Sequence, residues 1–382
     1  MRYNLNQYRF GVNYTPATEW YFCWNNFNPQ DIANDFDAIE QLGADHIRLM
    51  LVWPWFHPNP GYVSEAHLNR LHTLMTLAEK SNLDVSVALF TGWLSGYQFA
   101  PVFTGNEPFY SAPRQLDLQK FFMTAVANTI KDCKNFLGFD LGNEINCSWQ
   151  SADLTVGDSW HKQMLDLADA LIPNAVHVNG VDHQPWFHPA TFSPQTLARH
   201  SKIIALHCWV LFTGALDRVK DRDPFMQQPL HLIDGLGTLA RTFGGDLTKP
   251  VWAQEFGMSE EWLKPERIPA FLENAMQCGI AGGVNWFTWW SSHDIVNKFE
   301  FHPVEYTLGL IDTDNKIKPQ GKIFRKMADS LRGKKVQSSQ NRSVAMPLPS
   351  HHTDAETWTC LEAWMNANKL GGLAGGRGGE DG

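Results

Sequence analysis

Eight short apolar runs, each followed by a polar or aromatic segment, recur along the 382 residues of the chain. They lie at residues 10–14, 46–53, 84–90, 136–142, 175–180, 203–209, 250–257 and 282–290. Stretches of helical spacing separate them, and the first of these, residues 31–43, ends on Gly43 as a helix C-cap should. The others lie at residues 65–82, 121–135 and 160–174. This alternation is typical of parallel strands that are buried on both faces.

Eight strand–helix repeats predict an α/β fold, a single (β/α)8 TIM barrel over residues 1–331. An open, doubly wound sheet is the main alternative, but no GxGxxG turn follows the first run. A polar, turn-prone C-terminal extension at residues 332–370 follows, and within it residues 356–370 have the spacing of a helix that packs on the barrel. The Gly-rich tail, residues 371–382, is expected to be flexible.

The composition excludes several classes of function. A net charge of −9 without a basic stripe argues against a nucleic-acid partner. The chain has no apolar stretch approaching the about 18 residues of a membrane span, and its first residues lack the apolar core of a signal peptide. Its 6 cysteines are scattered without a CxxC pair. We therefore expect a cytoplasmic protein with no membrane partner and no cofactor, and the sequence leaves the oligomeric state open.

Two glutamates stand at the carboxyl ends of predicted strands, where chemistry occurs in such barrels. Glu144 follows Asn143 after the fourth run, and Glu255 ends the seventh. Strands four and seven face each other across an eight-stranded barrel, so both acids are expected to project into one mouth. Cleavage of a glycosidic bond requires two opposed carboxyl groups. One protonates the leaving oxygen, and the other attacks or stabilises the oxocarbenium-like centre.

The surroundings assign a role to each glutamate. A nearby negative charge and partial desolvation are expected to raise the pKa of Glu144 and keep it protonated, as a general acid must be. Glu255, near the cation Arg48 and the donors of His207 and Trp209, is expected to stay ionised and act as the nucleophile.

Aromatic residues suggest what the site binds. The chain has 16 Trp and 24 Phe, and flat aromatic faces suit ligands with apolar C–H faces and hydroxyl edges, such as sugars. Taken singly, each strand-end residue has an ordinary structural explanation, but their joint occurrence favours a β-glycosidase. Asn143 is the candidate to hold the sugar's 2-hydroxyl. The predicted substrate-binding residues are Arg48, Trp53, Trp93, Asn143, Asn179, His207, Trp209 and Trp290.

LGNEIN and WAQEFG resemble the motifs of a clan of retaining (β/α)8 glycoside hydrolases, in which Asn-Glu supplies the acid/base and a later Glu the nucleophile. With Arg48, His207 and Trp290, the chain resembles glycoside hydrolase family 5 over most of residues 10–331. HCWVLFTGALDR and VEYTLGLIDTDNKIKP resemble subfamily 18 of that family. This resemblance implies an intracellular bacterial β-mannosidase that cleaves the mannosyl-β-1,4-N-acetylglucosamine linkage of N-glycan cores.

Two positions depart from the family pattern. Trp209 stands where the family usually has a Tyr whose hydroxyl bonds the nucleophile, and an indole N–H can donate this bond but cannot accept one. The segment FTGWLSG after the third strand lacks a His that many members carry near there.

A retaining exo-β-mannosidase for short oligosaccharides is therefore the leading hypothesis, with the two carboxyl groups about 5–5.5 Å apart. An endo-β-1,4-mannanase, a β-glucanase or a β-glucosidase of the same fold remains an alternative. A non-catalytic carbohydrate-binding barrel is less consistent with the presence of both glutamates. A metal-dependent hydrolase requires clustered His and Asp ligands, and the 15 His residues do not form such a set in the sequence. No metal site is expected.

Overall fold

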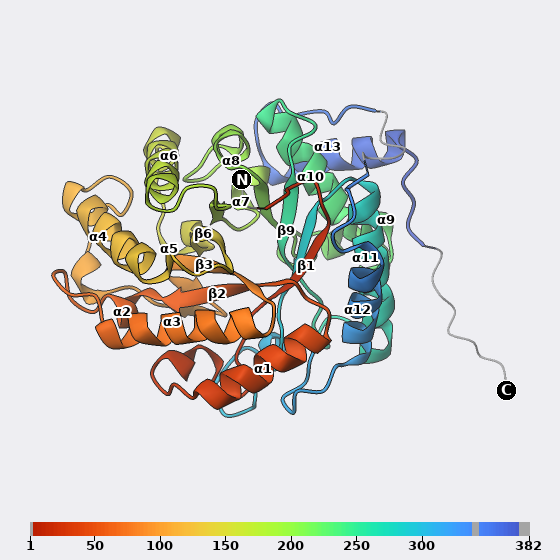
Figure 1. The fold of residues 1–382 in the computed structure, drawn as a ribbon. Helices are drawn as coiled ribbons and strands as arrows, with labels where there is room; N and C mark the ends of the chain where they lie inside the picture. Colours follow the sequence, from red (N-terminus) through yellow and green to blue (C-terminus); the bar gives the residue numbers. More distant parts are fainter. Residues whose placement is uncertain (1–2, 338–343, 374–382) are drawn as a thin grey trace.

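The computed structural model describes residues 3–337 and 344–373. Its centre is an eight-stranded sheet with strand order β7-β6-β3-β2-β1-β10-β9-β8, and every pair of hydrogen-bonded neighbours in it is parallel. The strands at the two ends of this order, β7 and β8, also lie in contact, so the sheet curves round on itself (Figure 1). The predicted (β/α)8 TIM barrel is confirmed.

Each of the eight predicted apolar runs overlaps one barrel strand. The strands are β1 (Arg9–Asn13), β2 (His46–Val52), β3 (Asp84–Thr91), β6 (Phe136–Asn143), β7 (Val178–Gly180), β8 (Ile204–His207), β9 (Val251–Phe256) and β10 (Trp286–Trp289). Almost all of their residues are buried, because one face of the sheet lines the barrel interior and the other is covered by helices. A small antiparallel hairpin after β3, made of β4 (Trp93–Leu94) and β5 (Tyr97–Gln98), was not predicted.

Helices surround the barrel (Figure 1). The longer ones are α1 (Pro29–Gln41), α3 (Glu65–Lys80), α4 (Pro113–Ile130), α6 (Leu154–Leu171), α8 (Pro194–His200), α10 (Leu232–Gly244), α11 (Ile268–Ala281) and α12 (Pro319–Leu331). Short helical turns in the loops include α2 (Trp53–Phe56), α5 (Ile145–Ser148), α7 (Gln184–Phe187), α9 (Gln227–Leu230), η1 (Trp20–Trp24) and η6 (Pro303–Thr307). Gly43 follows α1 with a φ of 83°, the left-handed conformation that its predicted capping role requires. None of the described helices combines the length and apolarity that crossing a bilayer requires.

The C-terminal extension contributes one helix, α13 (Asp354–Ala367), which packs on α10 and α7. Its Trp358 is buried, and the indole N–H donates a hydrogen bond to the carbonyl of Thr213 at 2.9 Å. Thr213 lies in the loop after β8, so α13 supports a loop at the carboxyl end of the barrel. Of the Gly-rich tail predicted to be flexible, residues 374–382 lie outside the described residues, and the proposed domain boundaries stay predictions.

The amino-terminal end of the barrel is filled by aromatic side chains. Trp252 and Trp286 are fully buried, with their ring centroids 5.3 Å apart in an edge-to-face arrangement. The indole N–H of Trp252 donates to Oγ1 of Thr288 at 2.6 Å, and a ring nitrogen of His46 lies 2.7 Å from the same oxygen. This end is packed core, which leaves the opposite end for a ligand.

Candidate active site

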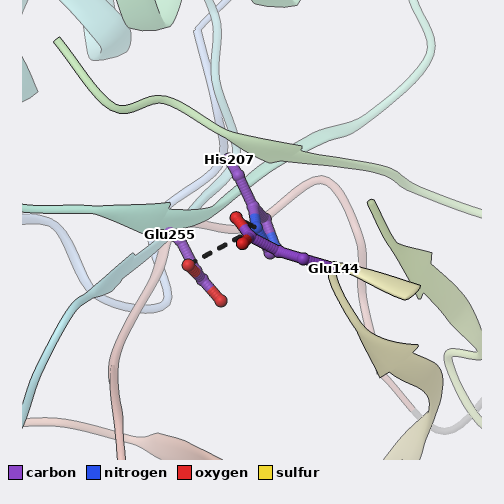
Figure 2. Close-up of side chains that lie close together, drawn as sticks. All are labelled: Glu144, His207 and Glu255. Atoms are coloured by element: carbon purple, nitrogen blue, oxygen red, sulfur yellow. Dashed lines mark hydrogen bonds and ion pairs between the residues drawn. The ribbon is translucent and has the colours of Figure 1, made fainter. Parts of the chain in front are cut away.

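A cavity of about 370 Å³ opens at the carboxyl end of the barrel. Both predicted catalytic glutamates, Glu144 and Glu255, line it, together with Trp93, Trp209 and Trp290. Figure 2 shows Glu144 and Glu255 reaching toward each other from different strand ends, with His207 beside them. The structure therefore brings the two acids into one site.

The backbone at Glu144 turns sharply to present this side chain. Glu144 has φ 43° and ψ 49°, a left-handed conformation that costs free energy in any residue with a Cβ. Its N–H donates to the carbonyl of Gly180 at 2.8 Å, and α5 begins at the next residue. The strand thus ends in a strained turn that directs a carboxyl group into the cavity, as strained residues at functional sites often do.

Arg48 lies beneath the cavity and organises the polar groups around it. This fully buried guanidinium donates to Oδ2 of Asp140 at 2.7 Å, to Oε1 of Glu255 at 2.5 Å and to Oδ1 of Asn143 at 3.0 Å. The backbone of Gly180 passes close above, where a Cβ would lie 2.5 Å from Asp140 Oδ2, so only glycine fits. Arg48 was predicted to bind substrate, and the structure places it on Glu255 and Asn143, outside the lining of the cavity.

Glu255 is held by donors on both of its oxygens. Besides Arg48 on Oε1, the indole N–H of Trp209 donates to Oε2 at 3.2 Å, and Nδ1 of His207 lies 3.4 Å from Oε2. Burial raises the pKa of Glu255, while the charge of Arg48 and the hydrogen bond from Trp209 oppose this rise. Trp209 therefore makes the bond to this carboxylate that the family pattern assigns to a Tyr at its position.

Glu144 lies in a different electrostatic environment. Burial, followed by the nearby charge of Asp182, raises the pKa of Glu144 to about 8, although Arg48 partly opposes the rise. A raised pKa was predicted for this residue, and Asp182 is the negative charge responsible. Glu144 is thus mostly protonated at neutral pH, as a general acid must be.

The hydrogen bonds among Asp140, Gln254 and His207 are also consistent with a proton on Glu144. Oδ2 of Asp140 accepts from Nε2 of Gln254 at 3.1 Å, so Oε1 of Gln254 faces Nε2 of His207, 3.2 Å away. That ring nitrogen must donate to the amide oxygen. Burial lowers the pKa of His207 and favours its neutral form, which leaves Nδ1 as an acceptor. Nδ1 lies 2.9 Å from Oε1 of Glu144, where a protonated carboxyl can donate.

Glu144, His207 and Glu255 each offer one potential metal-ligand atom, and these three atoms lie within 4.8 Å of one another. A divalent cation can bridge such a spacing. Arg48 and the Trp209 indole already occupy the oxygens of Glu255, however, and a metal ion would bring a second cation against the guanidinium. The donor set fits a proton-exchanging pair of acids better than a metal centre.

Two predicted substrate-binding residues lie elsewhere. Trp53 is fully buried in an aromatic cluster, with its ring centroid 5.2 Å from that of Phe90 and 5.7 Å from that of Trp149. Asn179 is buried against α6, where its Nδ2 lies 3.2 Å from Nδ1 of His161. A position near a strand end does not determine which face the side chain takes. The structure places neither Trp53 nor Asn179 in the lining of the cavity.

The other predicted residues gather at or just below the cavity. Asn143 lines it, with its amide N–H donating to the carbonyl of Trp93 at 2.8 Å. Trp93, Trp209 and Trp290 contribute walls, and His207 touches both glutamates from below.

A third carboxyl group lines the cavity, and it was not among the predicted residues; nor were two aromatic walls. Glu305, in η6 after β10, accepts a hydrogen bond on Oε2 from the hydroxyl of Ser95 at 2.9 Å. Burial, with a contribution from the charge of Glu144, raises the pKa of Glu305 to about 7. The two aromatic walls are Phe212 and Trp262, whose ring centroids lie 5.8 Å apart. All of these residues lie in loops or short helical turns, where the sequence carries no periodic signal.

Comparison with known proteins is consistent with this geometry. Residues 5–181 match the family described as cellulase (glycosyl hydrolase family 5). A probable mannan endo-1,4-beta-mannosidase F from Aspergillus flavus is 23% identical over 187 residues, which cover 43% of this chain and 39% of the relative. The chain thus matches well under half the length of that curated relative.

Solved structures match over a much larger share of the chain. A GH5_18 protein from Streptomyces cattleya in complex with GlcNAc is 27% identical, with a TM-score of 0.87, and the match covers 95% of this chain and 92% of that one. A variant of a GH5_18 protein from the same organism, in complex with Manβ1-4GlcNAc, is 26% identical with a TM-score of 0.86 and the same coverage. The chain is therefore similar to glycoside hydrolase family 5 over residues 5–181, and to solved GH5_18 structures over almost all of its length.

Proposed function

We propose that this protein is a retaining exo-β-mannosidase that hydrolyses Man-β-1,4-GlcNAc or short β-1,4-mannosides. The observation that carries the proposal is the pairing of two unlike acids in one cavity. Glu144, with a pKa raised to about 8, is suited to give a proton, and Glu255, held by Arg48 and Trp209, is suited to attack.

The proposed reaction has two displacements. In the first, Glu255 forms a bond to the anomeric carbon while the bond to the leaving oxygen breaks and the proton of Glu144 passes to that oxygen. In the second, a water molecule attacks the same carbon, its proton returns to Glu144, and Glu255 leaves as a carboxylate. One oxygen of Glu144 lies within 4.8 Å of one oxygen of Glu255. This close approach supports the retaining route, in which the carboxyl groups stand about 5–5.5 Å apart.

Exo action is supported by a wall on one side of the cavity. The β4–β5 hairpin meets the segment after β10, where Ser95 bonds Glu305 and the rings of Tyr97 and Phe301 lie 5.5 Å apart, edge to face. Trp20 packs on Phe301 with a centroid distance of 4.8 Å. A sugar chain cannot continue through packed side chains, so this wall favours a substrate that ends in the cavity.

The substrate class is supported by the relatives. GH5_18 proteins from Streptomyces cattleya have been solved with GlcNAc and with Manβ1-4GlcNAc. An endo-β-1,4-mannanase is the second candidate, since the curated relatives are named as probable endo-mannosidases. A cytoplasmic location is part of the proposal, and the presence of 6 free cysteines supports it.

A panel of p-nitrophenyl β-glycosides, mannosyl-β-1,4-N-acetylglucosamine and mannan tests the proposal. We expect turnover of the β-mannoside and the disaccharide, release of mannose alone, and β-mannose as the first product seen by proton NMR. Release of internal oligosaccharides from mannan would favour the endo-mannanase, and α-mannose as the first product would exclude retention.

A further inference from the structure

Glu305 is an acid that the proposed reaction does not use. It is only partly exposed and faces the cavity that holds Glu144 and Glu255. Within the described part of the chain, no cationic side chain lies within ion-pair distance of it. Its partners are neutral donors, the hydroxyl of Ser95 at 2.9 Å and the indole of Trp290.

Such an acid has an energetic reason to face a ligand. Removing a carboxyl group from water without a cation is costly unless hydrogen bonds replace the lost hydration. A carboxylate has about four acceptor sites on its two oxygens, so Ser95 and Trp290 leave capacity toward the cavity. Sugar hydroxyls are neutral donors of the same kind as the hydroxyl of Ser95, and they suit a carboxyl group that lacks a cation.

The position of Glu305 indicates which part of the substrate it meets. Its bond to Ser95 is part of the wall that closes one side of the cavity. The segments after β8 and β9 supply Phe212 and Trp262, and Phe212 is 55% exposed, which marks the rim open to solvent. A sugar that ends in the cavity therefore points its terminal ring at the wall, and its remaining part leaves past the rim.

We propose that Glu305 accepts hydrogen bonds from the C3 or C4 hydroxyl of the terminal sugar, the groups that lie across the ring from the anomeric carbon, and so restricts the enzyme to chain ends. This inference rests on the proposed exo-glycosidase function and adds a substrate-binding residue to it. A further sugar attached at C3 or C4 would displace this bond and meet the wall, so substrates substituted there are rejected.

The test is a cycle that combines enzyme variants with deoxy substrates. Wild type, Glu305→Ala and Glu305→Gln are assayed on p-nitrophenyl β-mannoside and on its 3-deoxy and 4-deoxy analogues. Glu261→Gln is the control, because Glu261 is an exposed glutamate in the segment after β9. We expect Glu305→Ala to lower kcat/KM for the parent substrate about 10- to 100-fold, Glu305→Gln to lower it less, and the control to match wild type.

The decisive result is non-additivity. With the wild-type enzyme, one deoxy analogue is expected to have a kcat/KM lower than that of the parent substrate by a similar factor. With Glu305→Ala, that analogue and the parent substrate are expected to have the same kcat/KM, because the hydroxyl of the parent has no partner left. An equal penalty for each deoxy analogue in wild type and variant would overturn the inference, as would wild-type kinetics in both variants. If Glu305→Ala fails to fold, the isosteric Glu305→Gln gives the same readout.

The outcome is separable from that of the proposed function. If the panel reveals another β-glycoside as the substrate, the β-mannosidase assignment fails, and the same cycle with deoxy analogues of that sugar still decides the role of Glu305.

Discussion

The two ends of strand β9 lie in different environments, one apolar and one rich in acidic groups. At its amino-terminal end, Trp252 packs on Trp286 and its only polar atom is bonded to Thr288. At its carboxyl end, Glu255 is buried beside Glu144. The first environment consists of packed aromatic rings, in which the indole of Trp252 has a neutral partner, whereas the second confines several acids around the guanidinium of Arg48.

The amino-terminal end of the barrel thus contributes packing, and the carboxyl end holds the groups proposed for the chemistry. Buried acids close together oppose one another's ionisation, so the pocket end carries an electrostatic cost that the packed end avoids. Burial and this repulsion raise the pKa of Glu144 to about 8, and the proposed reaction depends on the proton that Glu144 then carries. Changes at the two ends are therefore expected to have different consequences.

The largest effect is expected at the pocket end. Glu144→Gln and Glu255→Gln should each lower turnover by about two to four or more orders of magnitude, because each removes a group that takes part in bond breaking. The thermal midpoint should be unchanged or raised, since a buried acid is replaced by a neutral amide of the same shape. Steady-state assays and calorimetry on the same samples check both expectations. Near-normal turnover in either variant would remove that residue from the mechanism.

A substitution three residues earlier on the same strand is expected to lower stability and to leave turnover unchanged. Trp252→Ala should lower the free energy of unfolding by about 3–5 kcal/mol, the usual range for removing a buried Trp. Under conditions where the variant is folded, its kcat should stay close to that of wild type. Denaturant unfolding and a kinetic assay at low temperature measure the two quantities. A large loss of kcat in a fully folded variant would mean that the two ends are coupled.

A further substitution tests the hydrogen bond to the proposed nucleophile. Trp209→Phe keeps an aromatic wall but removes the N–H that bonds Oε2 of Glu255. A hydrogen bond to a charged group contributes about 1.5–3 kcal/mol, so kcat/KM should fall about 10- to 150-fold. Trp262→Phe, which changes a neighbouring wall without touching Glu255, serves as the comparison. An equal loss in both variants would indicate that the ring of Trp209 matters and its N–H does not.

The smallest effect is a shift in pH dependence. Glu144 must be protonated to act as the acid, so activity is expected to fall as pH rises through its pKa of about 8. The charge of Asp182 contributes to raising that pKa, and Asp182→Asn removes it. The alkaline limb of the profile of kcat/KM should therefore move to lower pH by about one unit. An unchanged limb would assign the alkaline pKa to another group.

The sequence predicted the barrel because each strand forms a continuous apolar run that is buried on both faces. It predicted the two glutamates because the order of strands alone places the fourth and seventh opposite each other. It missed the β4–β5 hairpin, whose two-residue strands carry no measurable period.

Side-chain direction was harder to predict. Trp53 and Asn179 stand near strand ends like the residues that line the cavity, yet Trp53 packs on Phe90 and Asn179 contacts His161. Glu305 lies far along the chain from Ser95, and only the folded loops bring these two side chains together. Tertiary contacts, which a single sequence does not display, decide such cases.

The assignment of Glu255 as nucleophile and Glu144 as acid/base is tested most directly by trapping the covalent intermediate. A 2-deoxy-2-fluoro-β-mannoside with a dinitrophenyl leaving group should add one fluorosugar to the wild-type protein, and peptide mapping should locate it on the carboxyl group of Glu255. A label on any other residue, or complete hydrolysis of the reagent to an α-configured product without labelling, would contradict the account.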